Sequence, residues 1–454
     1  MKRTKTPKTR LAAACFAALV CAAAIVPAQA AETSTAGGSV SRAEYEKLRQ
    51  ETAEMKKAML QMQEQMSAMN KMQGSILSPA PIAAGGKDVV PTGSSLATLQ
   101  AEIDELKQKA RQTFPGTTSF LLTGYGAAGF TAQHGHDSFF TASFNPIFLW
   151  KLSDRLLFEG ELELELEGGE THLALEYAQA SYLLNDYMTF GAGKFLNPTN
   201  YFVQNQHPAW INKLPDKPLA VYDGLTPETL VGAQIRGAIP IGSTVVEYSL
   251  FGANAPRLIT EGDLETLGTL EFDNFDNADG HIAFGGHVGF LPIPQVEIGY
   301  GIEHSTVGPR NHSVNADLQS VDLNVVDDSE LLKGLINFRA QWVWSNIASY
   351  TYDADGSQGF GPLNFSNHRN GGYVQLSYRP SRVDHFCKDL EPVVRFDLLN
   401  QRGTPGGYEE KRWTVGLDYW LTPSTVFKAA YEWDSKSNGF PRQNAFMLQV
   451  ATGF

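Results

Sequence analysis

From residue 119 to residue 454, apolar and polar residues alternate in short segments that turn-forming residues separate. Near the end of the chain, Phe446, Leu448 and Val450 fall on one face, while Gln449 and Ala451 fall on the other. A period of two is typical of a β-strand with one apolar face. Sixteen such strands are predicted, beginning near residues 119, 138, 156, 171, 187, 229, 243, 281, 295, 315, 331, 371, 391, 411, 425 and 444.

The connections between these strands alternate in length. Tight turns are predicted at 153–155, 185–187, 241–243, 292–294, 327–329 and 421–424, and 381–390 lies on the same side. Most of the others are longer: 197–228, 255–280, 307–314, 349–370, 401–410 and 435–443. Short periplasmic turns that alternate with long external loops are typical of an outer-membrane barrel. The predicted fold class is therefore all-β, a 16-stranded antiparallel transmembrane β-barrel over residues 119–454.

The residues before the barrel follow a helical pattern instead. Apolar residues recur every three or four positions from Tyr45 to Ile76, which predicts an α-helical periplasmic coiled coil over 31–76. An amphipathic helix on a globular core would look similar, but the flanking linkers favour self-association. Proline and glycine predict a flexible linker at 77–95, and a shorter heptad run predicts a second coil at 96–112.

Residues 1–30 have the pattern of a secretory signal peptide. Five basic residues precede an apolar run from Leu11 to Val26, and Ala28-Gln29-Ala30 forms a small-residue cleavage site. Removal of these five basic residues would change the formal charge from −13 to −18, which argues against a nucleic-acid partner. Cys387 would be the one cysteine left, so no internal disulfide is predicted. We expect a barrel in bacterial outer-membrane lipid with its amino-terminal region in the periplasm.

The third predicted strand shows which face of each strand is polar. Five carboxylates occupy alternate positions: Glu159, Glu161, Glu163, Glu165 and Glu167. They cannot face hydrocarbon, so they are predicted to form an acidic wall of a watery lumen rather than the solvated face of a soluble sheet. The same alternation on later strands predicts a basic lumen wall of Arg339, Arg379, Arg395, Arg412 and Lys428.

These two walls would lie opposite each other, because the eleventh of sixteen strands is half a turn from the third. Charged side chains along a pore set its preference among ions. The alternative is that neighbouring acids such as Asp397, Asp418 and Glu432 neutralise the basic groups, so that they are only solvated lumen residues.

The third external connection, 197–228, contains five prolines, and among its aromatic residues Trp210 and Tyr222 are bulky enough to pack against an inner wall. A connection of this length without regular structure is usually functional or disordered, and the proline and aromatic content favours an ordered loop. We expect it to fold inward and narrow the pore, with an outward-facing cap as the alternative. The predicted constriction residues are Trp210, Lys213, Asp216, Lys217, Tyr222 and Asp223.

The sequence offers little support for metal binding or catalysis. His134, His136 and Asp137 form a metal-like cluster, but no second ligand pair follows at a telling spacing, and a surface loop is the preferred interpretation. Neither a Gly-x-Ser-x-Gly elbow nor a phosphate-binding loop is present. No metal, cofactor or enzymatic activity is therefore predicted.

The signal peptide, sixteen strands, long third loop and aromatic Phe454 together resemble the trimeric bacterial porins. The resemblance covers residues 119–454, and the coil before the barrel is similar in layout to phosphate-selective-type and sucrose-type porins. Phosphate-selective members carry lumen ladders of lysine and arginine, whereas this chain carries Glu159–Glu167. The resemblance implies a homotrimer and a role for Phe454 as an assembly signal read by the barrel-assembly machinery.

The function expected from the sequence is a porin, a passive water-filled diffusion channel for ions and small polar solutes. The alternative is a barrel that acts mainly as an envelope tether or spacer through its periplasmic coiled coil. In that case peptidoglycan would be a further partner.

Overall fold

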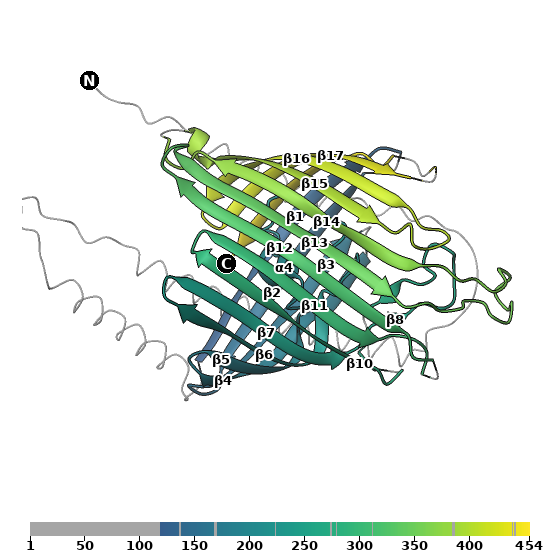
Figure 1. Cartoon of the computed structure of the whole chain (residues 1–454). Coiled ribbons are helices and arrows are strands. Elements are labelled where there is room, and N and C mark those ends of the chain that lie inside the picture. Colours follow the sequence, from purple (N-terminus) through teal and green to yellow (C-terminus); the bar gives the residue numbers. More distant parts are fainter. Residues whose placement is uncertain are drawn as a thin grey trace, which may run out of the picture. The chain divides into compact units, whose positions relative to one another are not determined.

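The computed structural model describes residues 119–454, except 136–137, 168–169, 223, 273–274, 278, 311, 384–385, 438, 440–441 and the side chain of Glu167. The predicted signal peptide, linker and coiled coils precede residue 119 and lie outside the described residues. Among the described residues, sixteen antiparallel strands form a closed barrel in which each strand pairs with its neighbours in chain order (Figure 1). No helix in this part of the chain is long and apolar enough to cross a membrane.

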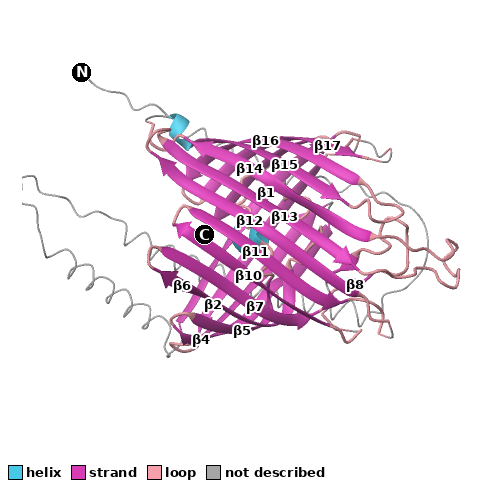
Figure 2. Cartoon of the chain, viewed as in Figure 1, coloured by secondary structure: helices cyan, strands magenta, loops and turns pink. Residues whose placement is uncertain are grey.

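The barrel strands agree closely with the sequence pattern, since each begins within four residues of its predicted start. Their bounds are β1 (Ser119–Gln133), β2 (Phe139–Lys151), β3 (Leu156–Glu167), β4 (Glu170–Asn185), β5 (Met188–Leu196), β6 (Thr229–Ile241), β7 (Thr244–Asn254), β10 (Ile282–Ile293), β11 (Val296–Thr306), β12 (Asn315–Ser329), β13 (Gly334–Ile347), β14 (Asn367–Arg379), β15 (Leu390–Asn400), β16 (Glu409–Thr422), β17 (Thr425–Lys436) and β18 (Ala445–Gly453). The external connections add a hairpin, β8 (Arg257–Leu258) with β9 (Leu270–Glu271), and helix α4 (Tyr201–Gln206). A 3-10 helix, η1 (Phe386–Asp389), precedes β15. The predicted all-β barrel is thus confirmed (Figure 2).

One predicted turn was placed too early. Residues 327–329 belong to β12, and the turn to β13 is formed by 330–333. The polar residues there were taken for a turn, but Arg382 on the next turn holds the Asp328 carboxylate at 2.9 Å and so supports the end of the strand. Lys333, with φ of 51°, closes the turn instead.

The strands present a polar face to the interior and an apolar face to the exterior. On β13, Arg339, Gln341 and Ser345 are buried, while the alternating Trp342 and Trp344 are partly exposed. Many large apolar side chains point outward around the barrel, and Leu173, for example, is 69% exposed. A soluble protein buries such residues, so this exterior suits contact with hydrocarbon.

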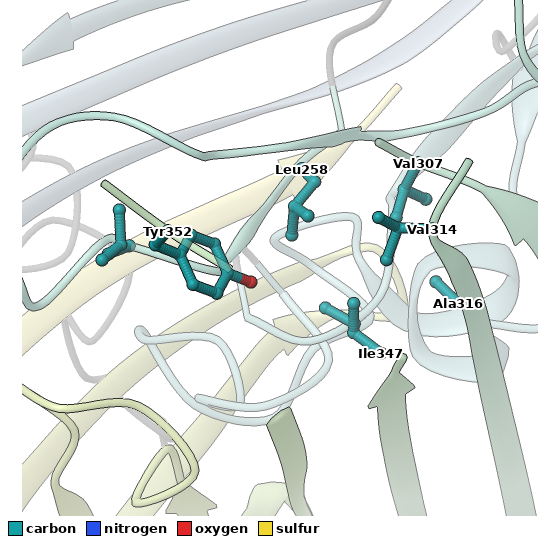
Figure 3. Close-up of a cluster of buried hydrophobic side chains, with 7 residues drawn as sticks. Leu258, Val307, Val314, Ala316, Ile347 and Tyr352 are labelled. Atoms are coloured by element: carbon teal, nitrogen blue, oxygen red, sulfur yellow. The ribbon is translucent and has the colours of Figure 1, made fainter. Parts of the chain in front are cut away.

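Three external connections pack against one another over β10 to β14 (Figure 3). Tyr352 from 348–366 stacks on Phe365 with ring centroids 4.7 Å apart. Gly268, with φ of 78°, fits beneath this pair because an added Cβ would lie 2.9 Å from the Tyr352 hydroxyl. The buried cluster consists of Leu258, Leu267, Val307, Val314, Ala316, Ile347 and Tyr352. These connections therefore have a small apolar core of their own.

The barrel closes where β1 pairs with β18, from Tyr125 opposite Gly453 to Gln133 opposite Ala445. Phe454 extends this seam. Its backbone N–H donates to the Gly124 carbonyl at 2.9 Å, and the Thr123 hydroxyl donates to its carbonyl at 2.6 Å. Its ring stacks on Phe144 of β2, with centroids 5.5 Å apart. Phe454 therefore ties the last strand to the first two.

Phe454→Ala is expected to lower the heat resistance of the folded barrel. An aromatic pair contributes about 0.5–1.5 kcal/mol beyond its buried area, and this pair lies at the closing seam. The measurement is the temperature at which the protein, refolded in detergent, loses its folded mobility on a gel. Phe446→Ala is the control, because Phe446 also faces outward on β18. Equal temperatures for the two variants would contradict a special role for the seam contact.

Candidate functional site

The connection 197–228 folds into the barrel interior instead of extending outward. Its base is closed, since the Asn197 backbone N–H donates to the Glu228 carbonyl at 2.8 Å and the Asn197 side chain donates to the Pro227 carbonyl at 3.0 Å. Asn200 caps α4 by accepting from the Val203 N–H, which explains locally why this short helix forms. We call residues 197–228 the inward loop.

The amino-terminal half of the inward loop is bound to strands β11 to β14. The Phe202 N–H donates to the Gln341 side chain at 3.0 Å, and the Ser320 hydroxyl donates to the Thr199 carbonyl at 2.7 Å. Phe202 and Val203 are buried against Val343 and Tyr373. These contacts join segments more than 100 residues apart, so local sequence gives no sign of them.

The carboxyl-terminal half of the inward loop is bound to strands β15 to β18. Leu214 is fully buried in a cluster with Val393, Ala430, Ala445 and Met447. Leu214 of the loop thus covers apolar residues on the inner face of these strands.

Charged groups strengthen this second contact. Lys213 Nζ lies 3.0 Å from the Glu391 carboxylate. The Arg395 guanidinium is bound to the carboxylates of Asp216 on the loop and Asp397 on its own strand, the latter at 2.7 Å. Arg412 also reaches Asp216, at 3.3 Å. Asp216 therefore fastens the loop to two arginines at once.

The predicted basic residues face inward, but the loop covers most of them. Arg395, Lys428 and Arg339 are 0%, 1% and 8% exposed. Lys428 donates to the Ala209 carbonyl of the loop, and Arg379 lies over the Trp420 ring with 5.3 Å to its centroid. The basic residues therefore do not form an open wall, because the loop and neighbouring carboxylates bind their side chains.

The predicted acidic residues lie on the uncovered side of the lumen. Glu161 is buried and accepts from the Tyr125 hydroxyl at 2.7 Å. Glu159 accepts from Gln179 at 2.7 Å and lies 3.4 Å from Arg236. Two others, Glu163 and Glu165, line a cavity. The side chain of Glu167 lies outside the described residues.

Cavities lie on both sides of the inward loop. One, of about 350 Å³, lies between the loop and β1 to β3, with β16 to β18 completing it. Its polar lining includes Thr131, Thr141, Ser143, Glu163, Glu165, His207, Asp216, Lys217, Arg412, Glu432 and Gln449. The other, of about 390 Å³, lies between α4 and β5 to β7, β10 and β11. The loop therefore narrows the lumen and leaves polar space on either side.

The remaining predicted constriction residues have structural contacts. Trp210 lies against β18, where a Cβ added at Gly453 would be 2.9 Å from its ring. Lys217 Nζ lies over the Tyr222 ring at 3.5 Å from the centroid. Asp223 lies outside the described residues, as do His136 and Asp137 of the metal-like cluster.

Outside the inward loop, the described chain shows little reactive chemistry. In the part of the chain that the structure describes, no group of three or more His, Cys, Asp or Glu could hold a metal ion. Cys387 is exposed in η1.

Two residues that the sequence pattern did not single out, Tyr125 and His207, line the cavity beside the acidic strand. No spacing or motif marked either of them.

No protein-family model and no curated protein sequence matches this chain. Similar solved structures include an anion-selective porin from Comamonas acidovorans, with 11% identity over 74% of this chain and 100% of that one, TM-score 0.48. Salmonella typhi OmpF in complex with daunomycin has 9% identity over 74% and 98%, TM-score 0.49. The outer-membrane channel DcaP of Acinetobacter baumannii has 11% identity over 74% and 97%, TM-score 0.49.

Proposed function

We propose that this protein is a porin, a passive water-filled diffusion channel for ions and small polar solutes in a bacterial outer membrane. The observation that carries the proposal is the inward loop, which enters a barrel with an apolar exterior and leaves polar cavities on both sides. Polar solutes would cross along these cavities without meeting hydrocarbon. Passage would be passive, down the concentration gradient of each solute.

Within this proposal the predicted residues have distinct roles. Glu163 and Glu165 of β3 form the solute-facing part of the acidic lumen wall, whereas Glu161 is buried against Tyr125. Asp216 and Lys213 hold the inward loop in place, and with Lys217 they form the constriction. The basic residues of β13 to β17 support the loop from behind. Charged side chains at a constriction set the preference among ions.

The proposal extends to residues outside the described part of the chain. Residues 1–30 direct export, and the coiled coil at 31–76 lies in the periplasm, where it joins subunits of a homotrimer. Phe454 serves as the assembly signal, which its place at the closing seam supports. Chemical crosslinking of the native membrane, followed by size analysis of the full-length chain and of a chain lacking residues 32–112, tests the assembly.

Conductance in planar bilayers tests the channel itself. Purified folded protein is expected to insert in discrete steps of equal conductance, because each closed barrel holds a fixed aqueous path. Protein unfolded by heating in detergent is the control and should give no steps. Folded protein that inserts without conductance steps would overturn the proposed function.

A further inference from the structure

Two short turns on the same rim of the barrel are joined into one unit. The turn 330–333 connects β12 to β13, and 380–389, which contains η1, connects β14 to β15. The Arg382 backbone N–H donates to the Lys333 carbonyl at 3.2 Å, and its guanidinium lies 2.9 Å from the Asp328 carboxylate. Figure 2 shows η1 at the barrel end opposite the long loops. We call the described residues of these two turns the rim ridge.

The rim ridge exposes large apolar side chains. The exposed fractions are 90%, 51%, 39% and 61% for Leu331, Leu332, Val383 and Phe386. Other short turns carry polar residues, for example Asp154 and Ser243. Lipid surrounds the whole rim of a membrane barrel, whereas these four side chains lie in the sector from β12 to β15. An exposed apolar patch confined to one sector indicates one local partner.

The chain before β1 contains a segment with a matching apolar face. Residues 96–112 place on one stripe of the predicted helix Leu96, Leu99, Ile103, Leu106 and Ala110. A single helix of this length gains most of its stability from packing such a stripe. β1 begins at Ser119, opposite Lys151 of β2, which leads into the short turn 152–155. The segment is therefore attached to the rim that carries the ridge.

The segment is long enough to reach the ridge. In the closed barrel, β15 lies four strand spacings from β1. At about 4.8 Å each, and with strand tilt, this is about 25 Å along the rim. Residues 113–118 span about 20 Å when extended, and a helix over 96–112 is about 25 Å long. A short tether also gives an effective concentration of the order of millimolar, which favours the chain's own segment over other partners.

We propose that residues 96–112 dock as a helix on the rim ridge of their own chain. Ala110 lies beside η1, and Leu96 lies toward Leu331, which is the direction that the connection to β1 requires. Docking covers the exposed leucines and fixes the point from which residues 31–95 leave the barrel. The ridge lies outside the proposed solute path, so conductance and docking are measured separately.

Crosslinking to Cys387 tests the docking, because this cysteine is exposed in η1. In Ala110→Cys, a short flexible bismaleimide added to isolated outer membranes is expected to link residues 110 and 387 within one chain. Gln108→Cys is the matched control, because residue 108 lies on the opposite side of the predicted helix, and it should link severalfold less. Equal yields from the two variants, or no link in either, would overturn the proposal. So would a link between two chains, because a neighbouring copy would then cover the ridge.

A second change alters the ridge and leaves η1 intact. Leu331→Ser with Leu332→Ser, added to Ala110→Cys, should lower the yield of the intrachain link severalfold, because burial of these leucines favours docking. Tyr187→Ser is the control, since Tyr187 is 52% exposed beside the turn between β4 and β5, and it should keep the yield of Ala110→Cys alone. Folded gel mobility confirms the barrel in each variant. If the leucine and tyrosine variants give equal yields, the ridge is not the docking surface.

Discussion

Replacing residues 201–222 by a short glycine–serine linker is expected to raise single-channel conductance severalfold. The inward loop fills the middle of the lumen, from Gln341 on one side to Lys428 on the other. The base of the loop would remain closed by the hydrogen bonds between Asn197 and residues 227–228, so a flexible linker can join the ends. Conductance in planar bilayers measures the change.

The same replacement is expected to move ion selectivity toward anions. Arg395, Arg412 and Lys428 are bound to the loop, and they would become accessible to water once it is removed. The reversal potential across a potassium chloride gradient reports this change. Circular dichroism and folded gel mobility confirm that the barrel has formed. A folded variant with the parent conductance and reversal potential would show that the inward loop neither narrows the pore nor masks charge.

Arg395→Met is expected to loosen the inward loop and to destabilise the protein by about 3–5 kcal/mol, the usual cost of leaving buried charges without a partner. Arg395 is fully buried, and its removal leaves the buried Asp397 without its ion-pair partner and Asp216 with Arg412 alone. The apparent unfolding temperature in detergent and the rate of proteolysis within residues 201–222 measure the two effects. Both should change in the same variant.

A triple variant is the control for Arg395→Met. Adding Asp216→Asn and Asp397→Leu removes the stranded charges, and replacing a buried ion network by neutral groups is often close to neutral in stability. The triple variant should therefore recover much of the lost unfolding temperature. If it is less stable than Arg395→Met alone, the effect comes from packing and not from unpaired charge.

The barrel could be predicted closely because the alternating pattern that identifies each strand lies within that strand. On β3, for example, the alternation of Glu163 and Glu165 with Leu164 and Leu166 reveals strand, facing and environment within a few residues. Turn positions follow from local chemistry too. The error at 327–329 arose where that chemistry was misleading, because a distant arginine, Arg382, stabilises an acidic strand end.

The functional site could be predicted only in outline. Proline and aromatic content indicated an ordered connection at 197–228. The alternation of polar and apolar residues along their strands predicted that Arg395 and Lys428 face the lumen. Neither pattern predicts that the loop would cover these basic residues, or that Asp216 would bridge Arg395 and Arg412. His207 gave no signal, because a lone histidine in a loop has no spacing to interpret.

The strands, their two faces and the acidic and basic strips therefore follow from local sequence, because a period of two acts over neighbouring residues. Which charges remain available to a solute was settled by the folded barrel. That depends on contacts such as Asp216 with Arg395, formed across 179 residues. Partners this far apart are brought together by barrel closure and loop packing, so the acidic side is left open and the basic side is masked.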